Sequence, residues 1–321
     1  MLRYVIRRIG WMIVVLFFIS ILTFLIFYKM PPQDPAVLFS GKITTPATIA
    51  HTRHRLGLDR PIYVQYGLFV ERFIVGDQYG WPGLGYSFES GVSVRSEVIS
   101  RAWVTAQLAV GAAIVWLLLG IPIGIISALK RRTLADRAAM GFALFGVSAP
   151  VFWIGLIALV IFWHYLHISS GTGYVPITQS PVSWFGHFWL AWVVLALLYA
   201  GFYARMVRGN MLEVMSEDYI RTARAKGLSE RRVIAKHGLR AALTPVVTML
   251  GLDLGALMGG AIVTESVFNI PGLGPYVIDA TLRSDIPAVI GVTIFAAFAI
   301  VFANFVVDIT YAFLDPRIRY A

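Results

Sequence analysis

The feature that most constrains this chain is a series of long apolar runs, each long enough to cross much or all of a bilayer as a helix. The six runs lie at residues 9–28, 102–129, 138–163, 188–204, 243–264 and 287–312. Helices and closed barrels are the structures that satisfy their backbone hydrogen bonds in lipid, and runs of this length are too long for barrel strands. The sequence therefore predicts an all-α integral membrane protein with about six transmembrane helices.

Composition and charge agree with this class. Of the 321 residues, 58% are hydrophobic and 14% are charged, whereas a soluble domain has about 25% charged residues. The net charge is +10, but the basic residues lie between apolar runs, where they set membrane topology, so nucleic acid is not expected as a partner. The chain has no cysteine, which excludes disulfides, thiolate zinc sites and cysteine nucleophiles.

The distribution of Lys and Arg predicts the orientation of the chain. Nine basic residues lie between 205 and 240, four lie at 130–137, and the loop 164–187 has none. Because cytoplasmic loops are enriched in Lys and Arg, both basic loops and both arginine-bearing termini are expected to face the cytoplasm. The first run, 9–28, is longer than the apolar part of a signal peptide, about 7–15 residues, and is interpreted as an uncleaved helix.

The chain then has three parts. Residues 1–28 form a cytoplasmic tail and the first helix, 29–101 form an extracytoplasmic segment, and 102–321 form a core of five helices with a cytoplasmic loop at 205–245. Pro122 and Pro150 are expected to kink the second and third helices, because proline removes a helical hydrogen bond.

Two short helices are predicted in the extracytoplasmic segment. Thr45, Pro46 and Gly57 stand at the positions of a cap, a first-turn proline and a terminating glycine, and a second helix is expected within 59–76. One face of the second helix is apolar, with Ile62, Tyr66, Phe69 and Phe73. The segment is either a folded cap on the outer ends of the spans or a docking surface for an external partner, and the two are compatible.

The cytoplasmic loop is predicted to contain a basic helix-glycine-helix. Ser216 precedes two acidic residues, Lys226 ends the pattern and Gly227 follows it, which together mark a short capped helix. A second helix is expected from Ser229 onward. Such an element either lies on anionic lipid headgroups or docks as a rigid knob in a groove of a cytoplasmic partner.

The residues of this loop carry a family resemblance. The string from Tyr219 to Leu228 resembles the EAA loop of binding-protein-dependent ABC-transporter permeases, in their dipeptide and oligopeptide (DppB/OppB) branch. The general pattern has Glu-Ala-Ala, three residues and Gly, whereas Arg221 replaces the glutamate here and Pro245 lies further from the glycine. The resemblance implies that the ATPase-coupling residues are Tyr219, Ile220, Arg221, Thr222, Ala223, Arg224, Ala225, Lys226 and Gly227.

Other stretches resemble the same family, in the same order along nearly the whole chain. They are 83–88 (GLGYSF), 264–274 (TESVFNIPGLG), 283–287 (RSDIP) and the ending 308–320, which contains Asp315-Pro316-Arg317. The resemblance implies an ABC type I importer permease fold in a bacterial cytoplasmic (inner) membrane.

The resemblance also implies the partners and the mechanism. They are a second homologous permease subunit, two cytoplasmic ATPase subunits (or one fused), an extracytoplasmic substrate-binding protein and membrane lipid. Closure of the ATPases on ATP would move the helix at 217–227 and switch the spans between inward-open and outward-open states. The chain is not expected to be an enzyme or to hold a cofactor: it has no G-x-x-x-x-G-K-[ST] motif, and ATP and Mg belong to the partner subunits.

The implied cargo is di- or oligopeptides, and nickel, glutathione or another small solute is the alternative within the family. A stand-alone channel or secondary transporter is a remote alternative, which inverted repeats would favour, but the sequence shows no convincing internal repeat. A membrane scaffold without transport is disfavoured by the glycines and the acid in the fifth run.

That fifth run contains Gly251, Gly255 and Gly259, a double G-x-x-x-G pattern that allows helix backbones to approach closely. The glycines serve packing within this chain, or a seam with the partner permease or a moving gate. Asp253 lies among them, and a carboxylate in hydrocarbon costs at least about 2.5 kcal/mol, so it is expected to face protein or a wet cavity. It either lines the pathway, where it could meet a peptide's N-terminal amine, or forms a structural pair or takes an interfacial position.

No metal site is expected. His164, His167 and His187 lie close together in the sequence, beside Trp163 and Trp184. Histidines flanked by tryptophans are interpreted here as residues of the membrane interface.

Overall fold

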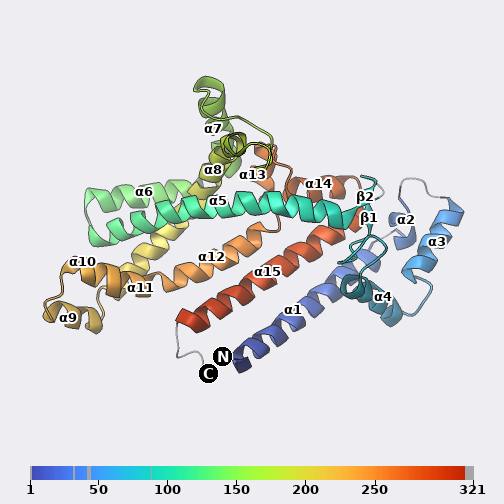
Figure 1. The fold of residues 1–321 in the computed structure, drawn as a ribbon, viewed down its shortest axis with the longest axis horizontal. Helices are drawn as coiled ribbons and strands as arrows, with labels where there is room; N and C mark the ends of the chain where they lie inside the picture. Colours follow the sequence, from blue (N-terminus) through green and yellow to red (C-terminus); the bar gives the residue numbers. More distant parts are fainter. Residues whose placement is uncertain (1, 32, 42–44, 88, 315–321) are drawn as a thin grey trace. The chain divides into compact units, whose positions relative to one another are not determined.

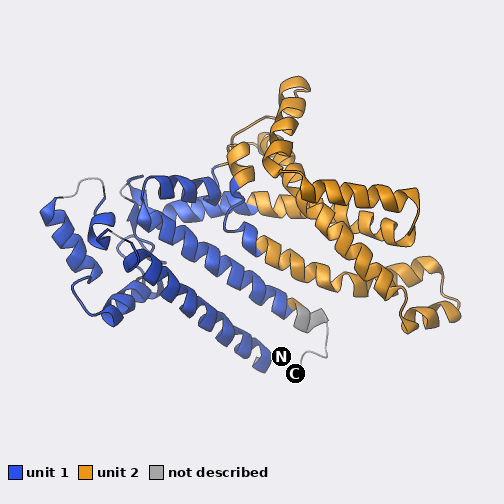
Figure 2. Ribbon diagram, turned by 180° about the vertical axis from the view of Figure 1, so that it is seen from behind, with its two compact units in different colours: residues 1–106, 255–262, 271–309 blue, residues 107–254, 263–270, 310–321 orange. Residues whose placement is uncertain are grey.

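The structure is a computed structural model that describes residues 2–31, 33–41, 45–87 and 89–314. Its contacts divide the chain into two compact units (Figure 2). Unit 1 comprises the described residues within 1–106, 255–262 and 271–309, and unit 2 comprises those within 107–254, 263–270 and 310–321. Several residues used above lie outside the described residues, namely Phe88, Asp315, Pro316, Arg317 and Arg319.

Unit 1 combines long helices with a small folded segment that joins α1 to α5 (Figure 1). Its strands β1 and β2 form an antiparallel hairpin in which Tyr86 pairs with Ser93. Its elements are α1 (Leu2–Tyr28), α2 (Pro35–Leu38), α3 (Pro46–Leu56), α4 (Ile62–Val75), β1 (Tyr86–Ser87), β2 (Val92–Ser93), the start of α5 (Val94–Leu129), the end of α12 (Thr244–Leu257), α14 (Leu273–Leu282) and most of α15 (Ile286–Leu314).

The segment between α1 and α5 folds onto the ends of two long helices. Thr45 caps α3 through a reciprocal capping box with Thr48, and Gly57 ends the helix, as the sequence predicted. Phe69 of α4 is buried in one cluster with Tyr28 at the end of α1 and Ile290 at the start of α15. The segment thus forms a cap over these helix ends.

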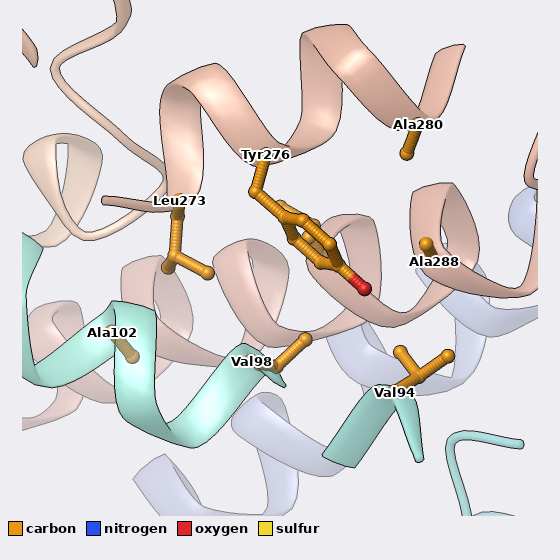
Figure 3. Packing of buried hydrophobic residues seen from close by; sticks show 8 residues of the cluster. Val94, Val98, Ala102, Leu273, Tyr276, Ala280 and Ala288 are labelled. Atoms are coloured by element: carbon orange, nitrogen blue, oxygen red, sulfur yellow. The ribbon is translucent and has the colours of Figure 1, made fainter. Parts of the chain in front are cut away.

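A second cluster holds α5, α14 and α15 together within unit 1 (Figure 3). Apart from Tyr276, its buried members are small or branched side chains, so the three helices approach closely. Its buried members are Val94, Val98, Ala102, Leu273, Tyr276, Ala280, Ala288 and Val292. At its edge, Gly291 leaves room for Val94, whose Cγ1 would be 2.4 Å from a Cβ at that position.

Unit 2 contains the other long helices and the basic loop within 205–245. Its elements are the remainder of α5, α6 (Leu134–Ser148), α7 (Val151–Ala158), the π-helical turn η1 (Leu159–Tyr165), α8 (Pro181–Val214), α9 (Asp218–Ala225), α10 (Glu230–Arg232), the π-helical turn η2 (Val233–Gly238), α11 (Leu239–Ala242), most of α12 and α13 (Ile262–Val267).

The expectation of about six spans agrees with the structure when each of two bent helix pairs is counted as one span; the described residues then provide four to six candidate spans. Among the described residues, α1, α5, α8 and α15 are each long and apolar enough to cross a membrane. Two further spans arise only when helix pairs are taken together, the α6 and α7 pair bent by 101° and the pair 230–242 with 244–257 bent by 44°.

The third span is therefore not the kinked single helix expected at 138–163. Its break falls at Ala149 and Pro150, where Ala149 is extended, with φ −81° and ψ 131°. A residue before proline is pushed out of the helical region, which ends α6 and starts α7 in a new direction. Pro122, by contrast, lies within α5, which continues through it.

The fifth span also differs from the expected 243–264. Helix α12 ends at Leu257, and Gly260 has φ +113°, a left-handed conformation that favours glycine. A Cβ at Gly260 would lie 2.6 Å from the backbone N of Gly274, so the chain passes close to another segment there. Gly259 consequently lies beyond the helix rather than on a continuous helical face.

Candidate transport and coupling sites

Helix α9 is amphipathic and is fixed to the loop that follows it. Ile220 and Ala223 are buried in a small cluster with Val233, and Met215 and Leu228 pack against that cluster. The other seven residues of the predicted coupling string are exposed. The loop therefore has its own small core beneath α9 and presents a polar, basic face to its surroundings.

The start of α9 differs from the sequence-based prediction, and its end agrees. Ser216 does not cap the helix: Glu217 holds the N-cap position, and the Ser216 hydroxyl donates to the carbonyl O of Glu213 at 2.6 Å. Glu213 lies at the end of α8, where the last carbonyl groups have no N–H donor within the helix. The Ser216 hydroxyl supplies a donor to one of them. Gly227 has φ +74° and directs the chain away from α9, as predicted.

An ion pair closes the helix-glycine-helix. The Arg224 guanidinium donates from Nε and Nη2 to the two carboxylate oxygens of Glu230, at 3.0 and 2.7 Å. Arg224 is thus occupied within the loop, whereas Lys226 is exposed and Arg221 has a long 3.4 Å contact with the exposed Asp218. Arg221 and Lys226 are therefore the basic residues of α9 most available to a partner.

Asp253 lies in a half-buried aromatic setting within unit 2. The Tyr203 hydroxyl donates to Asp253 Oδ2 at 2.7 Å. Trp116 stacks on Tyr199 with ring centroids 4.5 Å apart and lies 5.8 Å from the Tyr203 ring. Among the described residues, the buried Trp116 Nε1 has no hydrogen-bond partner. The carboxylate thus has a hydrogen-bond donor from another helix of the same unit.

The predicted glycines do not share one environment. A Cβ at Gly255 would lie 2.7 Å from Ala303 Cβ and 3.2 Å from Ile300 Cα, both on α15. A Cβ at Gly259 would lie 3.3 Å from Ala296 Cβ of the same helix. Gly251 is half-buried, like Asp253. Gly255 and Gly259 thus lie against another helix of this chain.

Sequence reasoning missed a close backbone contact between α6 and α8. A Cβ at Gly146 would meet the carbonyl O of Leu197 at 2.5 Å, and one at Gly201 would meet the carbonyl O of Ala143 at 2.5 Å. Gly124 of α5 is similarly close to the carbonyl O of Ala204, at 2.6 Å. The available signals were a G-x-x-x-G in α5, at 120 and 124, and small residues at 196, 200 and 204.

It also missed an ion pair at the start of α6. The Arg208 guanidinium of α8 binds both carboxylate oxygens of Asp136, at 2.8 and 3.0 Å. The Ser127 hydroxyl of α5 donates to the same carboxylate at 2.5 Å, and the backbone N–H of Arg132 donates at 2.9 Å. The exposed fraction of the Asp136 side chain is 8%. One carboxylate therefore ties α8 to the turn between α5 and α6.

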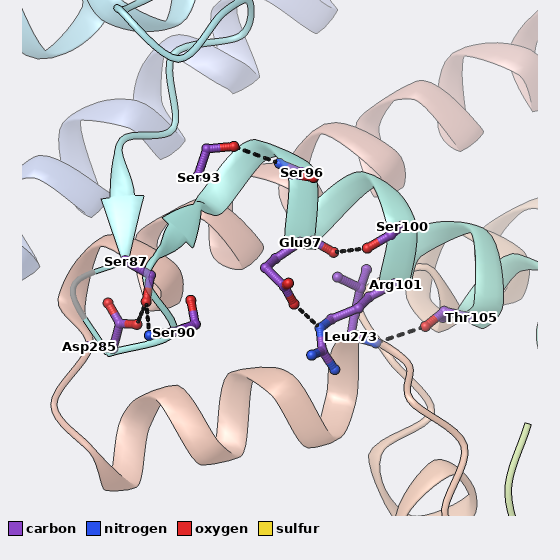
Figure 4. Close-up of polar contacts among 10 residues, drawn as sticks. All are labelled: Ser87, Ser90, Ser93, Ser96, Glu97, Ser100, Arg101, Thr105, Leu273 and Asp285. Carbon is purple, nitrogen blue, oxygen red and sulfur yellow. Dashed lines mark hydrogen bonds and ion pairs between the residues drawn. The ribbon is translucent and has the colours of Figure 1, made fainter.

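Two stretches that carry the family resemblance meet in unit 1 (Figure 4). The Ser87 hydroxyl donates to the Asp285 carboxyl, and Arg283 binds Glu89 at 2.8 Å. Burial raises the pKa of Asp285 above the usual carboxyl range, and the Ser87 hydrogen bond opposes that shift. Nearby, the backbone N–H of Leu273 donates to Thr105 Oγ1 at 2.9 Å. The hairpin and the α14–α15 turn therefore form one polar junction.

No group of three or more metal-binding side chains gathers anywhere in the part of the chain that the structure describes. The Nδ1 atoms of His167 and His187 each lie at hydrogen-bond distance from a backbone carbonyl O one helical turn earlier, at 3.0 and 2.7 Å.

These features define a multi-pass helical membrane protein with a separate short amphipathic helix. Two family profiles cover most of the chain. "Binding-protein-dependent transport system inner membrane component" matches residues 120–320, and the N-terminal part of such components matches residues 1–109. The chain therefore belongs to the family of binding-protein-dependent transport system inner membrane components.

Similar proteins agree with this assignment. A protein of Brucella abortus (strain 2308) named as a peptide transport system permease is 40% identical over 98% of each chain. The dipeptide transport system permease protein DppB of Escherichia coli (strain K12) is 37% identical, over 100% of this chain and 99% of that protein. The glutathione transport system permease protein GsiC of Escherichia coli O6:H1 is 39% identical over the full length of both.

A solved structure shows the fold. The inward-facing MetNI methionine ABC transporter has a chain that matches with a TM-score of 0.53 and 17% identity, over 68% of this chain and 96% of that one. This confirms the expected permease fold of type I ABC importers. As a member of the family, the chain is the membrane component of an importer that works with an ATPase and a binding protein; it has no catalytic activity and carries no cofactor.

Proposed function

We propose that this chain is one translocation subunit of an importer for di- and oligopeptides. It pairs with a second homologous permease, and two ATPase subunits, or one fused, grip the coupling helices from the cytoplasm. The observation that carries the proposal is α9, a short helix with its own core and an exposed basic face. The names of the relatives from Brucella and Escherichia coli support peptide cargo. Glutathione, itself a small peptide, is the second candidate because of the similarity to GsiC.

The orientation follows from the same element. A helix that docks on an ATPase lies in the cytoplasm, and both chain termini then lie on that side, as the Lys and Arg distribution predicts. The segment at 29–101 is extracytoplasmic in this arrangement, in a bacterial inner membrane. The buried pair of Ile220 and Val233 makes α9 a rigid knob, so movement of an ATPase groove is transmitted to α8 and the spans.

The test of this function combines cargo and coupling. The complex, purified with its ATPases in lipid nanodiscs and given its binding protein, is expected to hydrolyse ATP faster when di- to pentapeptides are added. Reversing the charges of Arg221 and Lys226 to glutamate should lower stimulated hydrolysis by about tenfold or more, because each docked charge-assisted bond contributes roughly 1.5–3 kcal/mol.

Arg224 is left unchanged in this variant because its reversal would break the pair with Glu230. The matched control is Arg231→Glu with Lys236→Glu, a reversal of two exposed bases outside α9. Stimulation by glutathione alone would keep the mechanism and change the cargo. Full assembly and stimulated hydrolysis by the α9 variant would show that α9 is not the coupling helix.

We further propose that Asp253 lies on the translocation pathway and meets the N-terminal ammonium of the peptide. Asp253→Asn is then expected to lower uptake of peptides with a free N-terminus by about tenfold, since one charge-assisted bond is lost. Uptake of N-acetylated peptides by a transporter that accepts them should change little. Tyr203→Phe is the matched variant, because it removes the 2.7 Å bond to Asp253 and keeps the ring. An equal loss for both kinds of peptide would identify Asp253 as a structural residue.

A further inference from the structure

A pocket of about 320 Å³ lies in unit 1, where the cap meets the ends of α1 and α15. Sites for small molecules begin at about this size, roughly 300 Å³. Its lining includes Tyr28, Pro287 and Ile290 from the long helices, and Arg55, Phe69 and Arg72 from the cap. None of these residues belongs to the coupling loop or to the cluster around Asp253.

The pocket lies at the boundary between lipid and water. Tyr28 is the last residue of α1, and Pro287 and Ile290 stand in the first turns of α15. Both helices are membrane spans, so their ends mark the depth at which hydrocarbon gives way to phospholipid headgroups. A ligand in this pocket is therefore at the level of lipid phosphates.

Two arginines, Arg55 of α3 and Arg72 of α4, line the pocket at this depth. The Arg72 side chain donates from Nη2 to the backbone carbonyl O of Arg55 at 3.1 Å, which ties α4 to α3. Among the described residues, neither Arg55 nor Arg72 has a carboxylate within ion-pair distance. Arg53, which lies on α3 with Arg55, pairs with Asp34. Guanidinium groups bind phosphate through paired, charge-assisted hydrogen bonds.

The one acidic side chain in the lining, Asp77, is already committed to the backbone. Its carboxylate accepts the N–H of Tyr79 at 2.8 Å and that of Gly85 at 2.9 Å. The pocket therefore keeps a net positive charge of one from Arg55, Arg72 and Asp77.

The floor of the pocket is aromatic. Tyr28 and Phe69 meet edge to face with centroids 5.5 Å apart, and Phe73 contacts Phe69 at 4.9 Å. Tyr79 and Tyr86 stack at 5.1 Å and form a flat wall. A small soluble anion would gain nothing from such a floor, whereas the glycerol and first methylene groups of a lipid bury apolar surface on it.

We propose that this pocket binds the headgroup of an anionic phospholipid. Arg55 and Arg72 hold the phosphate, and the aromatic floor packs against the glycerol and the start of the acyl chains. Such a lipid fixes the cap to the ends of α1 and α15. The proposal does not depend on the cargo of the transporter or on α9.

The test is native mass spectrometry of the intact complex in detergent, with phosphatidylglycerol or phosphatidylcholine added at equal concentration. The wild-type complex should retain phosphatidylglycerol in preference. Arg55→Gln with Arg72→Gln should lower that retention by about tenfold, since two charge-assisted contacts are lost. Arg60→Gln, an exposed arginine of the same segment that does not line the pocket, should leave retention unchanged.

Gln78→Trp gives a second test that keeps the charge, because Gln78 is exposed and lines the pocket, and a tryptophan there fills it. Gln78→Trp should also lower retention of phosphatidylglycerol. It replaces the double arginine variant as the test if that variant does not assemble. Equal retention by the wild type and the variant that assembles overturns the proposal. Displacement of the lipid by excess inorganic phosphate, with no preference between the two lipids, also overturns it and assigns the pocket to a soluble anion.

Discussion

Gly201→Leu is expected to separate α6 from α8 and to abolish both assembly and transport. At Gly201 a Cβ would already lie 2.5 Å from the carbonyl O of Ala143 and 3.1 Å from its Cα. These are backbone atoms within a helix, so they cannot rotate out of the way as the end of a side chain can. Even Gly201→Ala should cost about 1–3 kcal/mol, the usual range for overpacking a closely packed core.

The control uses two glycines on the same two helices. A Cβ at Gly209 of α8 or at Gly141 of α6 would meet no atom within 4 Å. Alanine at either site should be neutral or stabilise by about 0.5–1 kcal/mol, because glycine is a poor residue inside a helix. The measurement is thermal unfolding of the purified complex together with peptide uptake. Wild-type uptake by Gly201→Leu would show that α6 and α8 do not pack this closely in the membrane.

Arg208→Ala is expected to produce the second large effect. It leaves the Asp136 carboxylate, which is nearly inaccessible to solvent, with the Ser127 hydroxyl and one backbone N–H as its remaining partners. An uncompensated buried charge is strongly destabilising. The complex should unfold at a lower temperature, and uptake should fall by about tenfold or more, because the bidentate charge-assisted bonds are lost. Arg205→Ala, an exposed neighbour on α8, should have little effect.

A double-mutant cycle separates the ion pair from general damage to α8. Asp136→Asn with Arg208→Met removes both charges, and this pair of changes should be less harmful than the sum of the two single changes. Additive losses would mean that the two side chains act independently. The expected non-additivity would show that this pair links α8, which leads directly into α9, to the turn between α5 and α6.

The number of spans could be predicted from the sequence, but their breaks could not. A run of apolar residues shows that a segment suits lipid, and it carries no information about direction. The 101° bend between α6 and α7 depends on one dipeptide, Ala149-Pro150. Proline marks a weak point in a helix, and packing around it determines the angle.

The glycine pattern also identified a feature of the sequence without giving its place in the structure. A G-x-x-x-G motif indicates close approach and does not name the partner. The double motif at 251, 255 and 259 assumed a continuous helix, and α12 ends at Leu257. Close contacts with the backbone of a neighbouring helix also lie at Gly146 and Gly201, which belong to no such motif.

Side-chain pairs far apart in the sequence were beyond prediction. Asp136 and Arg208 are 72 residues apart. Asp136 is the one acidic residue between Glu97 and Glu213, but the sequence does not show which of the many Lys and Arg residues is its partner. Helix α9 was predictable because its signals are local: an apolar face, an acidic first turn and Gly227. The prediction that Ser216 caps α9 was wrong. A serine before two acids is a common helix cap, but here its hydroxyl donates to the carbonyl O of Glu213 at the end of α8.

The surroundings of Gly227 show which physical constraint determines where α9 ends. A Cβ there would meet no atom within 4 Å, yet the backbone has φ +74°. The position therefore restricts handedness and not size: a mirror-image D-alanine fits it without strain, whereas L-alanine must adopt a torsion that its own Cβ disfavours. The end of α9 is thus set by a stereochemical stop, and its position along the chain determines which side chains complete the last turn.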